Sequence, residues 1–411
     1  MNILLINHYA GSKHHGMEYR SYYLAREWVG LGHQVSIVAA SFSHVRTKQP
    51  EVVNSVTKEI VDGIEYYWLK TPEYFGNGIK RAVNIYTFIS RLYLSSTMIR
   101  NQVNPDVVIA SSTYPLDIFP ASWIAKRSQA RLVYEIHDLW PLTPIELGGM
   151  SKWNPFIMSL QLAEDFACKH AHKIISILPH ADRYLVTRGM DRNKYYAIPN
   201  GVVVDEWETD QSIVPDEHQS AIQKIMEKGN YIIGYAGAHG ISNALENLIH
   251  AAVLLKDAPI TFVLVGNGPE KEKLIDQAKK LGLTDENVVF LPPVPKKAIP
   301  GLLDMMDFLY IGLRKSSLFR YGVSPNKLID YMMAGKPIIN AIEASNDLVQ
   351  ESRCGITVRA EDPLSLAEGI RQMIELDKST LLEMGQKGKD YALKNHDYKV
   401  LARRFLECIE N

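Results

Sequence analysis

Short apolar runs bounded by turn residues recur along the chain, and the segments between them carry the three- to four-residue apolar spacing of helices. The runs that we expect to form buried strands lie at residues 3–6, 35–39, 64–69, 107–110, 132–136, 173–177, 231–234, 261–265, 288–290, 308–311, 337–340 and 355–358. Alternation of strand and helix predicts parallel sheets with helices on both faces, the α/β class.

The chain divides near its middle. A turn signal at residues 199–201 is followed by a polar stretch at 205–223, after which the strand–helix alternation resumes. We therefore predict two doubly wound, Rossmann-like domains, 1–200 and 201–389. A final helical segment, about 390–411, is expected to pack back on the first domain. Two such domains leave a cleft at the carboxyl ends of their sheets, where ligands bind in this architecture.

The amino-acid composition limits the classes of protein to which the chain can belong. The 411 residues are 46% hydrophobic and 22% charged, which suits two globular cores, and the net charge of −1 provides no general attraction for nucleic acid. Three scattered cysteines form neither a disulfide framework nor a metal cluster, so we expect a reducing, cytoplasmic setting. The first apolar run is too short for a signal peptide, and no run of about 18 apolar residues predicts a membrane span.

The segment 321–339 carries the strongest local signal. Ser324 suits an N-cap, Pro325 the first helical position, and Gly335 the position just past the end, which predicts a helix over 325–334. The start of such a helix attracts anions through its free N–H groups.

Two side chains on this helix have the chemistry to bind a nucleotide. Lys327 adds a full positive charge in the first turn, and Asp330 lies three residues further on the same face. A phosphate at the helix start and a ribose hydroxyl pair at the carboxylate would use both. A capped core helix with a solvated lysine explains the local pattern equally well.

Two glycine-rich turns follow strands of the second half. Gly237 and Gly240 follow the run at 231–234, and Gly266 and Gly268 follow the run at 261–265. Glycine lets a ligand approach the backbone, although either turn alone is as typical of a tight turn without a ligand.

In the first half, His137 and Asp138 directly follow the strand at 132–136, at the edge where ligands bind. The loop after the first strand contains His8, the pair His14 and His15, then Gly16 and Glu18. No further ligand spacing accompanies the histidine pair, so a polar loop is the better interpretation than a metal site.

Several enzyme classes lack their motifs here. The chain has no nucleophile elbow, no zinc motif and no GxxxxGK[ST] loop. No GxGxxG follows the first strand, which weighs against a dehydrogenase.

Taken in order, these segments resemble the family 4 glycosyltransferases of the GT-B fold. The likeness is to the branch that builds bacterial O-antigen, lipopolysaccharide and capsule, including its N-acetyl-fucosaminyltransferases. The motifs that carry it are 15–18, 31–35, 137–141, 198–201, 266–269, 324–328 and 334–337. Each motif is weak alone, but the ordered set is specific.

The resemblance implies roles at matching positions. The implied catalytic residues are His137, beside the transferred sugar, and Lys327, at the diphosphate. The implied donor-binding residues are Gly16, Gly237, His239, Val294, Ser324, Pro325, Asn326, Lys327 and Asp330. Asp330 would take the ribose hydroxyls and the backbone near Val294 the base. The acceptor-side candidates are His15, Glu18 and Asp138.

Two positions depart from the family pattern. Many members carry a first acid that contacts the donor sugar; eight positions before Asp330, this chain has Gly322. A basic residue is common in the loop that corresponds to 237–242, where His239 is the only candidate here. The phosphate site then depends more on Lys327, with Arg314 or Arg320 as possible helpers.

The family further implies transfer with retention of configuration, without a metal ion or cofactor, from a nucleotide-sugar that is expected to be UDP-linked. The sugar is expected to be an N-acetylated hexosamine or deoxyhexosamine, and the acceptor a lipid-linked glycan. The basic, aromatic segment 79–100 predicts either a peripheral membrane contact or a helix packed on the first sheet. A non-hydrolysing nucleotide-sugar 2-epimerase and an inactive partner subunit of a polysaccharide assembly complex remain alternatives.

Overall fold

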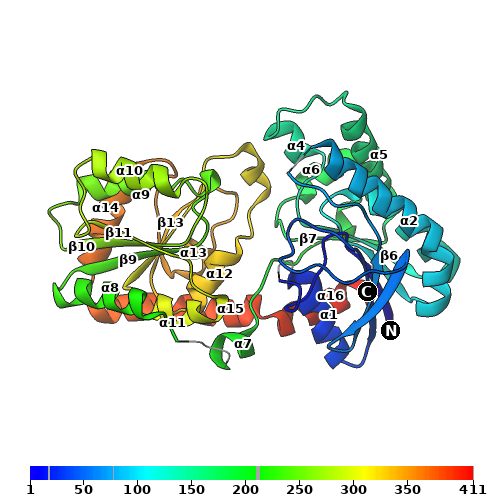
Figure 1. Ribbon diagram of the computed structural model, residues 1–411, viewed down its shortest axis with the longest axis horizontal. Coiled ribbons are helices and arrows are strands. Elements are labelled where there is room, and N and C mark those ends of the chain that lie inside the picture. The colour runs from blue at the N-terminus through cyan, green and yellow to red at the C-terminus, as the bar shows by residue number, and fades with distance from the viewer. Residues whose placement is uncertain (17–18, 77, 210–212, 411) are drawn as a thin grey trace. The chain divides into compact units, whose positions relative to one another are not determined.

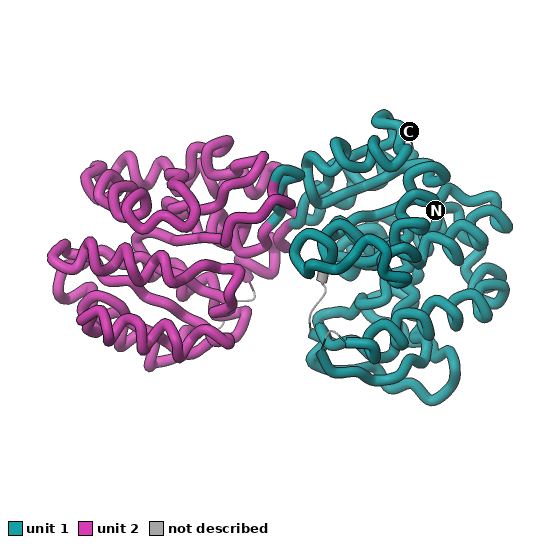
Figure 2. Tube along the Cα trace, turned by 90° about the horizontal axis from the view of Figure 1, so that it is seen from above, with its two compact units in different colours: residues 1–200, 320–324, 398–411 teal, residues 201–319, 325–397 magenta. Residues whose placement is uncertain are grey.

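A computed structural model of the chain describes residues 1–16, 19–76, 78–209 and 213–410. The chain forms two compact units (Figure 2). Unit 1 contains Met1–Asn200, Arg320–Ser324 and Tyr398–Asn411, and unit 2 contains Gly201–Phe319 and Pro325–Asp397. Each unit is a sheet with helices on both faces, so the prediction of two doubly wound α/β domains is confirmed. The sequence pattern did not reveal that the short segment 320–324 belongs to unit 1.

Unit 1 is built on an eight-stranded sheet with the order β3-β4-β2-β1-β5-β6-β7-β8 (Figure 1). Its strands are β1 (Asn2–Ile6), β2 (Gln34–Ala40), β3 (Val56–Val61), β4 (Ile64–Leu69), β5 (Val107–Ala110), β6 (Arg131–Ile136), β7 (Lys173–Ser176) and β8 (Tyr195–Ala197). All neighbouring strands are parallel except the β3–β4 pair. The order changes direction between β1 and β5, which is the topological switch point of the sheet.

Helices bury both faces of this sheet. They are α1 (Tyr19–Gly30), α2 (Ile79–Val103), α3 (Ile118–Ser128), α4 (Leu142–Glu146), α5 (Pro155–His170), α6 (Asp182–Leu185) and α16 (Tyr398–Glu410). One core joins α2, α3 and α5 to the strand positions on one face. On α2, Ile85, Phe88 and Leu92 are buried at helical spacing, which explains why this half-polar segment is a helix.

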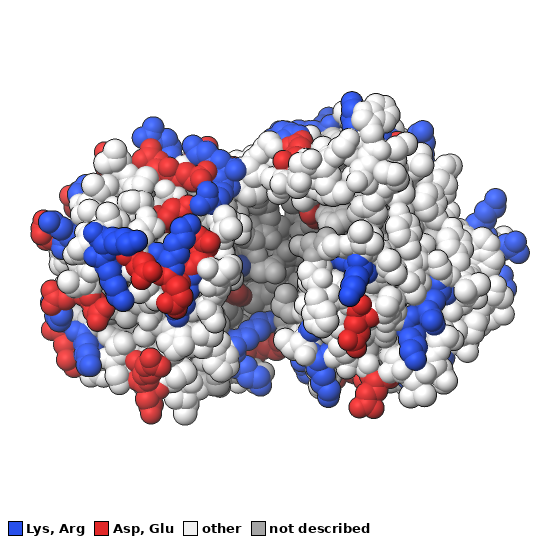
Figure 3. Space-filling view, turned by 45° about the horizontal axis from the view of Figure 1, so that its top comes forward, with Lys and Arg blue, Asp and Glu red and all other residues white. Residues whose placement is uncertain are grey.

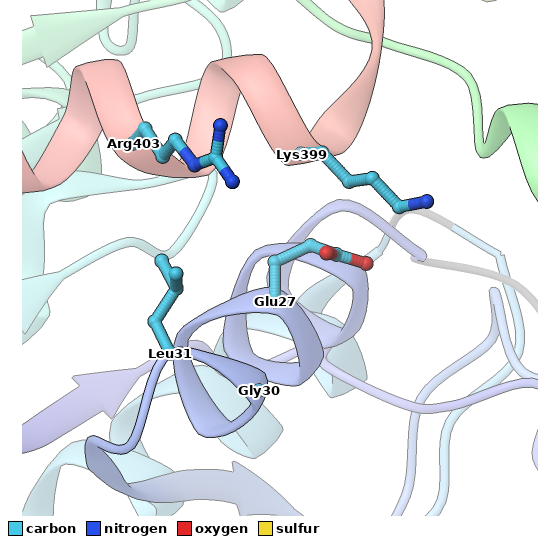
Figure 4. Close-up of a pocket in the computed structure, with 5 residues that line it drawn as sticks. All are labelled: Glu27, Gly30, Leu31, Lys399 and Arg403. Atoms are coloured by element: carbon cyan, nitrogen blue, oxygen red, sulfur yellow. The ribbon is translucent and has the colours of Figure 1, made fainter.

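Helix α16, at the end of the chain, packs on α1, and residues 390–397 before it belong to unit 2. The Trp28 indole Nε1 donates a hydrogen bond to the carbonyl of Ala402 at 3.1 Å, and its ring centroid lies 5.1 Å from that of Phe405. Figure 4 shows a small pocket on this seam, lined by Glu27, Gly30, Leu31, Lys399 and Arg403. None of the candidate catalytic, donor-binding or acceptor-side residues lines it.

Unit 2 has a six-stranded parallel sheet with the order β11-β10-β9-β12-β13-β14. The strands are β9 (Tyr231–Ala236), β10 (Ile260–Val265), β11 (Val288–Leu291), β12 (Phe308–Gly312), β13 (Ile338–Ala341) and β14 (Gly355–Thr357). This is the strand order of a classical Rossmann sheet, with its switch point between β9 and β12.

The helices of unit 2 are α7 (Val204–Thr209), α8 (Asp216–Glu227), α9 (Leu245–Leu254), α10 (Lys271–Lys280), α11 (Ile299–Asp304), α12 (Asn326–Met333), α13 (Leu348–Ser352), α14 (Pro363–Ile374) and α15 (Lys378–His396). In Figure 1, α9, α10 and α14 cover one face of the sheet, and α8, α11 and α15 cover the other. The polar stretch after residue 205 is therefore not a simple linker. Helix α8 begins in it and buries His218, Ile222 and Ile225 at helical spacing.

Candidate functional site

Each sheet presents its loops at the carboxyl ends of the strands next to the switch point, the position at which ligands bind to doubly wound sheets. In unit 2, the loop after β9 begins at Gly237, and the connection after β12 leads into α12. In unit 1, the first loop runs from Asn7 to Gly16, and Ser111 directly follows β5. His137 directly follows β6, as the sequence predicted.

The start of α12 differs from the prediction. The helix begins at Asn326, and Pro325 takes the N-cap position in an extended conformation without a side-chain cap. Ser324 does not cap the helix, because its hydroxyl accepts a hydrogen bond from the Asn200 backbone N–H at 2.9 Å. The predicted end is correct: the helix stops at Met333, and Gly335 has a φ of +66°.

Lys327 lies in a closed ring of hydrogen bonds beneath the loop after β9. Its Nζ donates to the Tyr235 hydroxyl at 2.6 Å and to Asn243 Oδ1 at 3.3 Å. The Tyr235 hydroxyl and Asn243 Nδ2 both donate to the carbonyl of Ala238, at 2.7 and 3.0 Å. These four residues hold the ammonium group against the glycine turn, so the side chain is not a freely solvated lysine.

Gly237 makes this arrangement possible. Its φ is +155°, and a Cβ at this position would lie 2.6 Å from Lys327 Cε and 2.7 Å from Nζ. The absence of a side chain thus leaves the space through which Lys327 passes. The sequence singled out Gly237 as a point of ligand approach; the structure shows that the residue approaching its backbone is Lys327.

The charges of Lys327 and Asp330 are both disfavoured by burial. Burial lowers the pKa of Lys327 to about 8, although the carboxylate of Asp330 acts in the opposite direction. Burial raises the pKa of Asp330 to about 6, against the effects of Lys296 and Lys327. A ligand that restores favourable partners to these charges gains binding free energy.

His239 is fully buried, and neither of its ring nitrogens has a hydrogen-bond partner among the described residues. Burial and the charges of Lys271 and Lys327 lower the pKa of this imidazole to about 4. At neutral pH it is therefore uncharged and does not replace the basic residue that is common in this loop. Burial of two ring nitrogens without hydrogen bonds costs folding free energy unless a ligand or a water molecule binds them.

The turn after β10 packs directly on the His239 loop. The His239 N–H donates to the carbonyl of Asn267 at 2.8 Å, and the Glu270 N–H donates to the carbonyl of His239 at 3.0 Å. A Cβ on Gly268 would lie 2.5 Å from the His239 carbonyl oxygen. The glycine turn after β10 therefore supports the loop after β9. Val294, the predicted neighbour of the base, lies half-buried in the loop after β11.

In unit 1, His137 faces a buried carboxylate. Its Nε2 lies 2.9 Å from Ser111 Oγ and 3.4 Å from Glu135 Oε2. The other oxygen of Glu135 accepts from Arg20 Nε at 3.0 Å. Burial raises the pKa of Glu135, but Arg20, His137 and Ser111 outweigh this effect and hold it at about 2. Glu135 is therefore a permanent anion behind the histidine.

The acceptor-side residues have mixed surroundings. Asp138 closes the turn that follows it, because it accepts from Leu139 N–H, Trp140 Nε1 and Thr143 Oγ1 at 2.8, 3.0 and 2.8 Å. His15 is buried, with Nδ1 2.9 Å from Ser12 Oγ and its ring against Trp68. These contacts shape the two loops. Glu18 lies outside the described residues.

Gly16 has a φ of +59°, and a Cβ there would lie 2.3 Å from Thr47 Oγ1. Only glycine fits this point, where the first loop meets the segment after β2.

The two arginines considered as helpers are engaged in ion pairs. Arg314 pairs with Glu246, and its Nε donates to the carbonyl of Ile241 at 2.9 Å. Arg320 contacts Glu146 at 2.6 Å. Gly322 is buried with a φ of +94°, a conformation that an acidic residue adopts only with strain.

Sequence reasoning missed the residues that hold the candidate site in place. Tyr235 and Asn243 surround Lys327, and Arg20, Ser111 and Glu135 surround His137. Glu135 gave a detectable signal, since a charged residue within a buried strand requires a partner. Among the described residues, no group of three His, Cys, Asp or Glu side chains is arranged to hold a metal ion.

Comparison with known proteins assigns this arrangement to a family. Residues 15–201 match the model of the glycosyl transferase 4-like domain, and residues 230–376 match that of the glycosyl transferases group 1. The two matches cover most of the chain. The chain belongs to the family 4 glycosyltransferases.

Relatives of this glycosyltransferase are similar over most of their length. It is 25% identical over 93% of both chains to the colanic acid biosynthesis glycosyl transferase WcaI of Escherichia coli (strain K12). It is 24% identical over 78% of both chains to the glycosyltransferase WbjE of Pseudomonas aeruginosa. A solved structure of Anabaena HepE in complex with UDP matches all of both chains, with a TM-score of 0.69 and 16% identity. The lipopolysaccharide enzyme WaaG matches 99% of both chains, with a TM-score of 0.66 and 14% identity. These structural likenesses show the GT-B fold.

Proposed function

We propose that this glycosyltransferase moves a sugar from a UDP-linked donor to a growing bacterial surface glycan, with retention of configuration and without a metal ion. The observation that carries the proposal is the ring of hydrogen bonds around Lys327 in unit 2. It holds one cation at the switch point of a Rossmann sheet. The similarity to WcaI and to the UDP complex of HepE supports the glycan and the nucleotide. An N-acetylated hexosamine or deoxyhexosamine is the proposed sugar.

The donor's diphosphate is proposed to lie against Lys327 and the free N–H groups at the start of α12, near Ser324, Pro325 and Asn326. Helix α12 has eight residues and no side-chain cap. The Leu328 N–H donates to the carbonyl of Pro325 at 3.1 Å, which leaves the N–H groups of Asn326 and Lys327 for a ligand. Asp330 would accept hydrogen bonds from the ribose hydroxyls, and the backbone at Val294 would contact the base.

His239 completes the proposed phosphate site. Its ring is neutral at neutral pH, and both nitrogens lack a partner among the described residues. A neutral imidazole donates one hydrogen bond, and an adjacent diphosphate would raise its pKa. In this assignment, the diphosphate is the hydrogen-bond partner that the buried imidazole of His239 otherwise lacks.

The chemical step is proposed to be mainly electrostatic. As the glycosidic bond breaks, negative charge develops on the departing diphosphate, and the ammonium group of Lys327 would stabilise that charge. Loss of one such donor typically slows an enzyme by roughly 10²–10³. His137 would contact the transferred sugar, and Gly16 would let the first loop approach the donor and the acceptor.

We propose a lipid-linked acceptor and a peripheral membrane contact on the inner face of the plasma membrane. Among the described residues, no helix is long and apolar enough to cross a bilayer. Helices α2 and α5 lie side by side, with the Tyr86 hydroxyl 2.8 Å from Ser159 Oγ. Their exposed large apolar side chains, together with flanking ones, are Phe75, Ile79, Val83, Tyr86, Tyr93, Leu94, Trp153, Met158 and Leu162.

The charge pattern fits a contact made mainly by apolar groups. On the face shown in Figure 3, uncharged surface predominates over unit 1, whereas acidic and basic side chains are intermixed over unit 2. Arg81 does not serve as a membrane anchor in this arrangement, because its Nε and a terminal nitrogen lie 3.3 and 3.1 Å from the Tyr9 hydroxyl.

One observation favours a second candidate, an inactive partner subunit of a polysaccharide assembly complex. Gly322 stands where many family members have the acid that contacts the donor sugar, and its positive φ suits glycine rather than an acid. Nucleotide binding without turnover would support this candidate.

The deciding experiment is mass spectrometry of the products from a panel of UDP- and GDP-sugars with a short lipid pyrophosphate-sugar acceptor. The proposal predicts one glycosylated acceptor and release of UDP. An isomerised nucleotide-sugar formed without acceptor would indicate a 2-epimerase, and binding without any product would indicate the partner subunit.

A further inference from the structure

A single buried guanidinium connects two features of unit 1 that the proposed function uses. Arg20 lies on α1 and is 4% exposed, and its partner Glu135 is fully buried. Arg20 Nε and a terminal nitrogen lie 3.0 and 2.9 Å from Glu135 Oε1. A buried ion pair is weak evidence for stability, because desolvation offsets the attraction between the charges. The geometry around it indicates a different purpose.

On one side, the carboxylate of Glu135 determines how His137 is presented. Ser111 Oγ donates its only hydrogen to Glu135 Oε2 at 2.6 Å. Ser111 Oγ also lies 2.9 Å from His137 Nε2, and because its hydrogen is given to Glu135 it must accept there, so Nε2 carries the proton. In the neutral ring, Nδ1 then keeps its lone pair. Glu135 and Ser111 therefore select one tautomer of His137 and fix the plane of its ring.

On the other side, the terminal nitrogens of Arg20 hold the turn that ends the first half of the chain. The terminal nitrogen that contacts Glu135 also donates to the carbonyl of Ile198 at 2.9 Å, and the other terminal nitrogen donates to the carbonyl of Pro199 at 2.6 Å. The next residue, Asn200, donates from its backbone N–H to Ser324 Oγ at 2.9 Å and from Nδ2 to the Ser324 carbonyl at 3.2 Å. Ser324 lies three residues before Lys327 in the chain.

We propose that Arg20 is a positioning residue for sugar transfer, which orients His137 through Glu135 and orients the 324–326 segment through the turn at Asn200. The proposal rests on the proposed function. A planar fork with several fixed donors is required to bind a carboxylate and two carbonyls together, and lysine does not provide it.

The test is a comparison of three variants that interrupt different parts of this chain of hydrogen bonds. Glu135→Gln is expected to lower kcat by about 10²-fold, because His137 loses its orientation, with the donor KM within twofold of wild type. Asn200→Ala is expected to raise the donor KM about tenfold with a smaller change in kcat, because it loosens the segment before Lys327. Arg20→Lys is expected to show both effects.

Arg188→Lys is the matched control, because Arg188 binds Asp165 in unit 1 through Nε at 2.8 Å and a terminal nitrogen at 2.7 Å. It should retain both kinetic constants. Equal losses of kcat and melting temperature in all four variants would show a merely structural role and overturn the proposal. A wild-type kcat and donor KM in Arg20→Lys would also overturn the proposal.

A second measurement separates failure of this inference from failure of the proposed function. The ring ¹⁵N spectrum of His137, assigned by its loss in His137→Gln, reports the tautomer without any substrate. Wild type should show the Nε2–H form, and Glu135→Gln and Arg20→Lys should show a tautomer mixture. An Nδ1–H ring in wild type, or an unaltered spectrum in both variants, would contradict the inference even if the chain transfers sugar.

Discussion

The ammonium group of Lys327 lies 2.6 Å from the hydroxyl of Tyr235 and 4.0 Å from the centroid of its ring. This phenol accepts from the lysine and donates to the carbonyl of Ala238, so it joins the start of α12 to the glycine turn after β9. Burial raises the pKa of Tyr235 above its ordinary value, which keeps the hydroxyl protonated and able to donate. The proposed phosphate site is thus preorganised before a ligand binds.

Removal of the lysine charge tests this site directly. Lys327→Met should weaken UDP binding by about 10- to 100-fold, the effect of one hydrogen bond to a charged group, and should reduce turnover further. Tyr235→Phe keeps the ring but loses the hydroxyl, so a smaller loss is expected. Calorimetry with UDP measures both. Lys336→Met, at the far end of α12, is the control and should bind UDP normally.

The pH dependence of UDP affinity follows from the two shifted groups. Lys327, with a pKa of about 8, loses its charge as the pH rises, and Asp330, with a pKa of about 6, loses its charge as the pH falls. Binding needs both charges, so affinity should be highest between pH 6 and pH 8. Binding at about pH 8 should also take up a proton, because the diphosphate favours charged Lys327.

Two variants assign the limbs of this profile. The terminal phosphate of UDP itself titrates at about pH 6. The contribution of Asp330 is therefore the difference in UDP affinity between wild type and Asp330→Asn at acid pH. Lys327→Met should remove the alkaline limb. A wild-type affinity that stays constant from pH 5 to about pH 9 would refute these assignments.

Gly237→Ala should displace Lys327 without unfolding unit 2. The new Cβ would overlap the end of a flexible side chain, which can move away, but the ammonium would then leave Tyr235. We expect UDP affinity to fall about tenfold. Gly282→Ala is the control, because Gly282 also has a positive φ, of +74°, but a Cβ there meets nothing within 4 Å. Equal affinities in the two variants would exclude the displacement.

The membrane contact can be tested by removal of exposed apolar side chains. The triple variant Phe75→Ser, Ile79→Gln, Leu162→Gln should sediment less with anionic phospholipid vesicles, because apolar burial drives interfacial binding. Val53→Gln with Ile60→Gln is the matched control, since these side chains are 81% and 75% exposed elsewhere in unit 1. Vesicle binding that is unaffected by the triple variant, or lost equally in the control, would disprove the contact.

The sheets were largely predictable because parallel strands are buried on both faces and stand out as apolar runs. Strand β3 escaped detection because it is an antiparallel edge strand in which only Val61 is fully buried. Helix α8 was hidden by its exposed polar face. The helical form of α16 was predictable because its apolar positions recur at helical spacing.

The candidate site was predictable to the extent that local motifs reported it. His137 and Gly237 directly follow β6 and β9, and Lys327 and Asp330 lie on α12, the helix that the local signals predicted. The partners of these residues come from positions far away in the sequence, as with Lys327 and Tyr235 or His137 and Arg20. Ser324 was misassigned as a helix cap because its true partner, Asn200, lies 124 positions away.

The most direct test of the donor site is a crystal structure of this protein with UDP. We expect a phosphate oxygen within hydrogen-bond distance of Lys327 Nζ, the first N–H groups of α12 on the same diphosphate, and the ribose hydroxyls on Asp330. UDP bound elsewhere, with Lys327 still held only by Tyr235 and Asn243, would contradict this expectation.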